Sequence, residues 1–272
     1  MKTGKLSGIL VAALLATPAF ADRARVEAYK NQLRDVRPPE LPRETARLIT
    51  SEKADAADAT SAAIALSGAS PQLIVGSVAK SSPQSAAIAA ATAIAAGSQL
   101  TTDVHLQPKL TVAITRAAVS AAPSEISAIV AESCKARPSA FYTIGVAAAE
   151  AAPKSSDKVI PAIIAGVPAL KPIIQRAQAD FKTANRSASL ALVLKHAENL
   201  LATISQDQQV SAEVLLSKET EISLAEKLVA KGGTLPPPPV QRPPFTTGPT
   251  QGEIPTAVTT EVAPIDRNYS SP

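Results

Sequence analysis

The chain contains very few of the residues from which covalent and metal-binding frameworks are built. A single cysteine, Cys134, excludes a disulfide scaffold and also the zinc and iron–sulfur sites that need several thiolates. Tryptophan is absent and aromatic residues make up only 3% of the 272 residues, so the core has to be built from aliphatic side chains and alanine. Glycine occurs at 11 positions without a three-residue period, which excludes a collagen-like helix.

Neither sign of charge dominates, since 27 Lys and Arg face 23 Asp and Glu. The strongly basic balance of a typical nucleic-acid-binding protein is missing, and we predict no nucleic-acid partner. Beyond the N-terminus, no long run of strongly apolar residues occurs. Even the uncharged stretch 81–100 consists mostly of Ala, Ser, Thr and Gln, so the mature chain is not expected to span a membrane.

Residues 1–21 have the three-part pattern of a cleavable signal peptide. Lys2 and Lys5 precede an apolar segment at 8–15, and Ala19-Phe20-Ala21 supplies the small residues that signal peptidase accepts. The apolar segment is too short for a membrane span. We therefore predict export and cleavage after Ala21, with the mature chain in the periplasm, at the cell surface or in the medium.

The middle of the chain is a tandem repeat marked by proline. Five prolines recur every fifteen residues, at Pro108, Pro123, Pro138, Pro153 and Pro168. A β-branched aliphatic residue lies six positions after each of them, at Ile114, Ile129, Ile144, Val159 and Ile174. Small residues follow at the thirteenth position, at Ala121, Ala136, Ala151 and Gly166, with Phe181 as the exception. Columns that stay in register over five units indicate a repeat architecture.

Each unit is predicted to form one short helix. Proline is suited to the first helical position because its missing N–H would have no partner there, and it also ends the preceding helix. A helix of about eleven residues is too short to be stable alone in water, so its aliphatic column must be buried against neighbouring helices. Short connections make successive helices antiparallel. The predicted fold is therefore all-α, with tandem antiparallel helices in an α-solenoid-like stack or bundle.

The pattern divides the chain into a signal peptide at 1–21, N-terminal helices at 22–69, the repeat array at 70–184, a helical pair at 185–233 and a tail at 234–272. Several finer predictions accompany this division. One helix is predicted from Asp22 to Arg37, and a second from Pro42 to Ala65 with a partly packed polar half. A loop is predicted from Gly97 to Leu106, and Pro161 and Pro172 are expected to kink or restart a helix, with the repeat decaying after residue 160. The last helix is predicted to be capped by Asp207 and to end at Gly232-Gly233.

The tail is rich in proline, including Pro236 to Pro239, and is predicted to be extended and disordered. The segment 240–245 reads VQRPPF, which a binding groove for proline-rich peptides could recognise. A plain spacer is the favoured interpretation.

Little in the sequence points to a chemical site. No nucleophile elbow, glycine-rich phosphate loop or His-Glu-x-x-His motif occurs, and we predict no catalytic, cofactor-binding or metal-ligating residue. His105 is predicted to be a solvated loop side chain, His196 an exposed helix side chain and Cys134 a small semi-buried filler. Glu125, Glu132 and Glu150 are expected on separate helices, and one ring of the pair Phe141-Tyr142 is expected in the core. Glycosylation sequons occur at Asn185 and Asn268.

Two units show the repeat most clearly: Ala122-Pro123 to Ile129, and Arg137-Pro138 to Ile144 with Ala147-Ala148. They resemble the alanine- and proline-rich tandem short-helix repeats of some exported bacterial proteins. The resemblance covers the repeat array, and it implies a helical fold and export but no particular activity.

These features together predict an exported, non-enzymatic repeat protein that binds or organises a protein or cell-envelope partner. Two alternatives remain open. One is an envelope-associated module whose alanine-rich faces self-associate or lie on the membrane, and the other is a secreted enzyme whose site is assembled from scattered polar groups.

Overall fold

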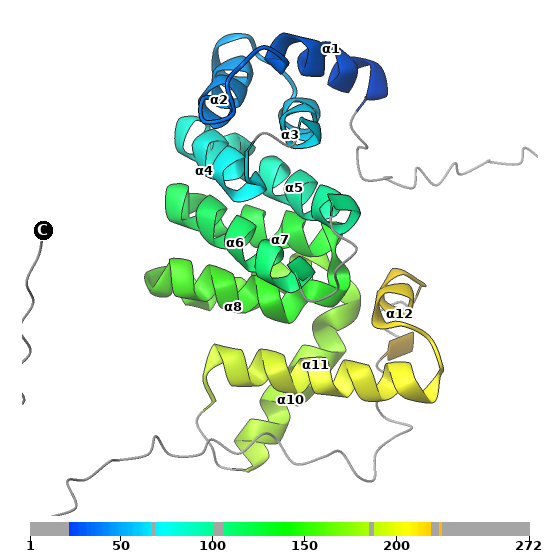
Figure 1. Ribbon diagram of the computed structural model, residues 1–272. Helices are drawn as coiled ribbons and strands as arrows, with labels where there is room; N and C mark the ends of the chain where they lie inside the picture. The colour runs from blue at the N-terminus through cyan, green and yellow to red at the C-terminus, as the bar shows by residue number, and fades with distance from the viewer. Residues whose placement is uncertain (1–21, 67–68, 101–105, 185–187, 219–222, 225–272) are drawn as a thin grey trace, which may run out of the picture. The chain divides into compact units, whose positions relative to one another are not determined.

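The computed structural model describes residues 22–66, 69–100, 106–184, 188–218 and 223–224, coloured in Figure 1. Within these ranges the regular structure is helical and no strand occurs, which confirms the all-α prediction. The signal peptide at 1–21 and the tail at 234–272 lie outside the described residues.

The α-helices follow one another along the chain with short connections. Their bounds are α1 Arg23–Leu33, α2 Leu41–Ser51, α3 Ala56–Ala65, α4 Pro71–Ser81, α5 Ala86–Leu100, α6 Leu106–Ala121, α7 Ile126–Ala136, α8 Phe141–Ala151, α9 Val159–Gly166, α10 Lys171–Thr183, α11 Leu190–Asp207 and α12 Ala212–Lys218. Short 3-10 turns precede five of them: η1 Pro83–Ser85, η2 Pro123–Glu125, η3 Pro138–Ala140, η4 Pro153–Lys158 and η5 Pro168–Leu170.

The helices form two layers in which each helix packs on the one two places further along the chain. The first layer contains α1, α3, α5, α7 and α9, and the second contains α2, α4, α6 and α8, with α11 packed on α8 (Figure 1). α10 packs against α11. This layering is the arrangement of an α-solenoid and confirms the predicted stack of antiparallel helices.

The proline-marked register is confirmed with one refinement. The aliphatic column, made of Ile114, Ile129, Ile144, Val159 and Ile174, is completely buried. The residue before Pro123, Pro138, Pro153 and Pro168 is extended, as in Arg137 with φ −146° and ψ 82°, because the proline ring disfavours the helical conformation there. Each of these four prolines opens a 3-10 turn, and the α-helix begins three residues after the proline in all but η4. Pro108 is the exception, because it is the third residue of α6.

Of the two outcomes predicted at Pro161 and Pro172, a kink or a restart, the structure shows a restart, since each proline lies at the beginning of a helix. Pro161 is the third residue of α9 and Pro172 the second of α10, so both lie in the first turn, where backbone N–H groups have no helical partner. The turn η4 extends to Lys158 and delays the start of α9, which brings Pro161 into that tolerated position. The repeat is less regular in this region, because η4 is longer than the other turns, α9 is shorter than α7 and α8, and α10 packs against α11.

The single helix predicted from Pro42 to Ala65 is two helices, α2 and α3. Lys53 has a left-handed backbone with φ 58°, and Asp55 caps the start of α3 through its side chain. The first half is also well packed, contrary to expectation, since Leu48 and Ile49 are buried. Neither glycine nor proline lies between Ser51 and Ala56, which is why the region resembles one helix.

Three other boundaries differ from the predictions. α1 ends at Leu33 instead of Arg37, and α5 continues through Leu100 into the predicted loop. Asp207 ends α11 and does not cap the next helix. Instead, the Ser211 hydroxyl accepts a hydrogen bond from the Val214 amide at 3.3 Å. The predicted end at Gly232-Gly233 lies outside the described residues.

Gly166 marks a close approach of α9 to α7, and it yields a testable contrast with Gly76. A Cβ on Gly166 would lie 2.4 Å from the Ala131 carbonyl oxygen, whereas one on Gly76 would lie 3.6 Å from Ala117. We expect Gly166→Ala to destabilise the fold by about 1–3 kcal/mol because the backbone must move. Gly76→Ala, at an ordinary contact distance, is expected to stabilise the fold by up to about 1 kcal/mol. Denaturant unfolding measures both, and a stabilising Gly166→Ala would contradict the close approach.

Candidate functional site

Few polar side chains are buried in the described part of the chain. They are Thr45, Asp58, Thr60, Thr111, Thr115, Ser133 and His196. Of these, Asp58 and His196 are ionisable, and a buried ionisable group needs a specific partner. The two sites lie in different regions, Asp58 on α3 and His196 on α11.

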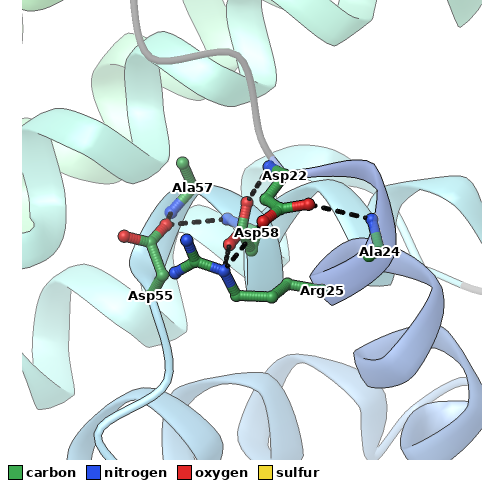
Figure 2. Close-up of polar contacts among 6 residues, drawn as sticks. All are labelled: Asp22, Ala24, Arg25, Asp55, Ala57 and Asp58. Carbon is green, nitrogen blue, oxygen red and sulfur yellow. Dashed lines mark hydrogen bonds and ion pairs between the residues drawn. The ribbon is translucent and has the colours of Figure 1, made fainter.

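The carboxylate of Asp58 lies between α1 and α3 with its side chain only 3% exposed (Figure 2). Its Oδ1 accepts a hydrogen bond of 2.7 Å from the backbone N–H of Asp22. Its Oδ2 lies 3.6 Å from Nε of Arg25, and the same nitrogen donates to Oδ2 of Asp22 at 3.3 Å. Asp58 therefore joins the start of the described chain to a helix 36 residues further on.

Local sequence explains how each residue of this cluster is placed. Asp22 caps α1 by accepting a hydrogen bond from the Ala24 amide at 3.0 Å, and Asp55 caps α3 by accepting from Ala57 and Asp58 at 2.9 and 3.0 Å. Asp58 occupies the third helical position, where an acidic side chain commonly reaches back to the N-cap amide. Here it bonds to the Asp22 amide of another helix, which couples the two helix starts.

The cluster changes the acidity of its members in opposite directions. Burial raises the pKa of the Asp58 carboxyl, an effect that the Asp22 amide and Arg25 partly offset. The pKa of Asp22 is lowered by its hydrogen bond from the Ala24 amide and by Arg25. The pKa of Arg25 is raised, chiefly by its hydrogen bond to Asp22. The ionised form of Asp58 is therefore the least compensated charge of the three.

The prediction that His196 is an exposed helix residue is wrong. Its side chain is 1% exposed, and Nε2 lies 2.9 Å from Oδ2 of Asp180 on α10. The ring also packs edge-on against Phe181, with ring centroids 5.7 Å apart. The other oxygen of Asp180 is 2.9 Å from Nε of Arg176. A sequence signal existed, because His196 lies on the same face as Val193 and Leu200, both of which are buried.

Other side chains that the sequence singled out are placed largely as predicted. Cys134 is completely buried, and burial raises the pKa of its thiol, which disfavours the reactive thiolate. Phe141 is in the core, while Tyr142 is partly exposed with Nζ of Lys195 5.1 Å from its ring centre.

The three glutamates lie apart, and two of them form ion pairs, Glu132 with Lys135 and Glu150 with Arg116. His105, Asn185 and Asn268 lie outside the described residues.

Both layers expose a mixture of side chains. On the second layer, the exposed residues include the charged Lys80, Lys109, Arg116 and Glu150 and the apolar Leu73 and Leu106. On the first, α5, α7 and α9 expose small or apolar residues, and we refer to Ile88, Ala128 and Ala165 as the first-layer face. Ile88 is 47% exposed, which is unusual for a large aliphatic side chain in a stack whose other isoleucines are mostly buried. Glu132 and Lys135 add charge at the end of α7.

Within the described ranges, no group of three or more His, Cys, Asp or Glu side chains is arranged to hold a metal ion. No described helix is both long and apolar enough to cross a lipid bilayer. The described residues form an all-α, two-layer helical repeat protein. Comparison with known proteins adds no relative, since no family model, curated protein or solved structure matches the chain.

Proposed function

We propose that this protein is exported, processed after Ala21, and acts as a non-enzymatic scaffold that binds a protein partner through the first-layer face. The N-terminal pattern supports export. The observation that carries the binding role is the exposure of small and apolar side chains on three successive helices of the first layer, Ile88 on α5, Ala128 on α7 and Ala165 on α9. An exposed apolar face edged by polar residues is typical of interaction surfaces.

The side chains of this face favour a helical partner. Alanine allows helix axes to approach closely, near the lower end of the usual spacing of about 8–10 Å. Ile88 then supplies the larger apolar contact, and the pair Glu132–Lys135 lies beside the small residues of α7. Such a surface is large and repetitive because each added helix pair extends it, which is how stacked repeats commonly bind proteins.

Site-specific photocrosslinking in an exporting bacterium tests this function. A crosslinking side chain placed at Ala128 is expected to capture a discrete protein, whereas the same group at exposed Lys109 on the second layer is not. N-terminal sequencing of the protein that carries the crosslinker is expected to give Asp22 as the first residue. Equal capture at both positions would contradict the assigned face, and a cytoplasmic chain that retains Met1 would contradict export. Capture of a second copy of the same chain would favour self-assembly instead.

A further inference from the structure

Asp58 is a buried carboxylate whose recorded partners are weak for a full negative charge. Its shortest contact is a neutral backbone amide, that of Asp22 at 2.7 Å. The nearest cation, Arg25, is 3.6 Å away, is 60% exposed and is shared with Asp22. A buried ionised carboxylate normally requires a close cation together with good hydrogen bonds, because desolvation is costly. The site therefore favours a positive charge at the position that the Asp22 nitrogen occupies.

The sequence places a proteolytic cut at the same nitrogen. The segment Ala19-Phe20-Ala21 predicts cleavage of the bond between Ala21 and Asp22. In this hydrolysis a peptidase of the export machinery adds one water molecule and breaks the C–N bond. Ala21 is left with a carboxylate, and the Asp22 nitrogen becomes an amine that takes up a proton near neutral pH. A donor of one neutral N–H thus becomes an ammonium with three.

We propose that the α-ammonium group of Asp22, formed when the chain is cut after Ala21, binds the Asp58 carboxylate and fixes α1 on α3 in the processed protein. This inference rests on the proposed export. It gives Asp58 a function that its burial alone does not explain, and it makes the docking of α1 stronger in the processed chain than in the precursor. Charge-assisted hydrogen bonds are about twice as strong as neutral ones.

The other charged groups around Asp58 already have partners, so the ion pair between the Asp22 ammonium and Asp58 is the main interaction that cleavage adds. Arg25 and Asp22 face Asp58 from α1, and Asp55 faces it from the start of α3. The Asp22 carboxylate is already engaged by the Ala24 amide and Arg25, and Asp55 is engaged in capping α3. Figure 2 shows the Asp22 nitrogen directed at Asp58, with the other contacts around it.

A two-by-two comparison of defined chains tests the proposal without depending on processing in the cell. One chain, 22–272, is released from a removable tag so that it begins at Asp22, and its matched control retains Phe20 and Ala21. Each is made with Asp58 and with Asp58→Asn. In the Asp58 background, the equilibrium constant for unfolding at pH 7 is expected to be about tenfold smaller for the Asp22 start than for the control. In the Asp58→Asn background the two starts are expected to agree.

The pH dependence supplies a second measurement. A carboxylate partner raises the pKa of the α-amine in the folded state above its usual value of about 8. The stabilisation is therefore complete below that value and is lost as the pH rises through the folded-state pKa. Nitrogen-15 NMR of the Asp22 amine reads this pKa directly, and does so even if Asp58→Asn folds poorly.

An α-amine with an ordinary pKa, or equal stability of the two starts with Asp58 intact, would overturn the docking. A protein recovered from cells with a first residue other than Asp22 would overturn processing after Ala21. The comparison of the two purified chains would still test whether an ammonium group at Asp22 binds Asp58. The failure of export and the failure of docking are thus separable.

Discussion

Replacing Ile144 by alanine is expected to lower the free energy of unfolding by about 2–5 kcal/mol. Ile144 is completely buried in α8, a helix that packs on both α6 and α11. The loss combines the transfer of the removed methyl and methylene groups with the cost of the cavity that they leave. Many neighbouring core residues are alanines, whose short side chains cannot extend to fill it. Ile144→Val, which removes one methylene, is expected to cost only about 0.5–1.5 kcal/mol.

Lys154→Ala is the matched control, because Lys154 is exposed in the turn η4 of the next unit. We expect its effect to stay within about 0.5 kcal/mol. Urea or guanidinium melts of the three variants measure the differences. Equal and small changes in all of them would mean that the proline-marked register does not place the aliphatic column in the core.

The repeat could be predicted from sequence because its signal is periodic and local. Proline limits the backbone at its own position and at the preceding one, so four of the five units begin at their own proline, and Pro108 lies in the first turn of α6. The isoleucine column then follows from helix geometry alone. The same rules leave two outcomes open at Pro161, a kink or a restart, because the effect of a proline depends on where the helix begins, and the longer turn η4 sets that start.

The split between α2 and α3 shows a different limit. Its decisive feature is the left-handed conformation of Lys53, which neither glycine nor proline announces in the sequence. The N-cap residue Asp55 is the available clue, and it lies between two segments that both form helices. A capping residue inside a long predicted helix can therefore mark a helix boundary even where glycine and proline are missing.

The Asp58 cluster could not be predicted from sequence, since its contact with Asp22 spans 36 residues and depends on how α1 packs on α3. Only the cleavage pattern at Ala21 could be read locally. The combination of the two is informative, because a cut predicted from one end of the chain coincides with an under-compensated carboxylate found in the fold.

His196→Ala is expected to lower the free energy of unfolding by about 2–4 kcal/mol, although an exposed histidine would predict almost no change. The variant removes a ring that packs against Phe181 and opens a cavity between α10 and α11. It also removes the partner of one Asp180 oxygen, while Arg176 keeps the other. Thermal or denaturant unfolding measures the loss. Asn199→Ala, an exposed change on the same helix, is the matched control and is expected to stay within about 0.5 kcal/mol.

A second variant separates the two contributions of His196. His196→Phe keeps an aromatic ring in place but cannot bond to Asp180, so its cost reports the hydrogen bond, which to a charged group is worth about 1.5–3 kcal/mol. If the pair served a chemical reaction, His196→Ala would abolish an activity while leaving the unfolding midpoint unchanged. A structural role predicts the reverse, because the imidazole is enclosed at 1% exposure and has no route to a substrate without opening the contact between α10 and α11. An unchanged unfolding midpoint for His196→Ala would contradict the burial of this side chain. It would also mean that the hydrogen bond between His196 and Asp180 does not stabilise the fold.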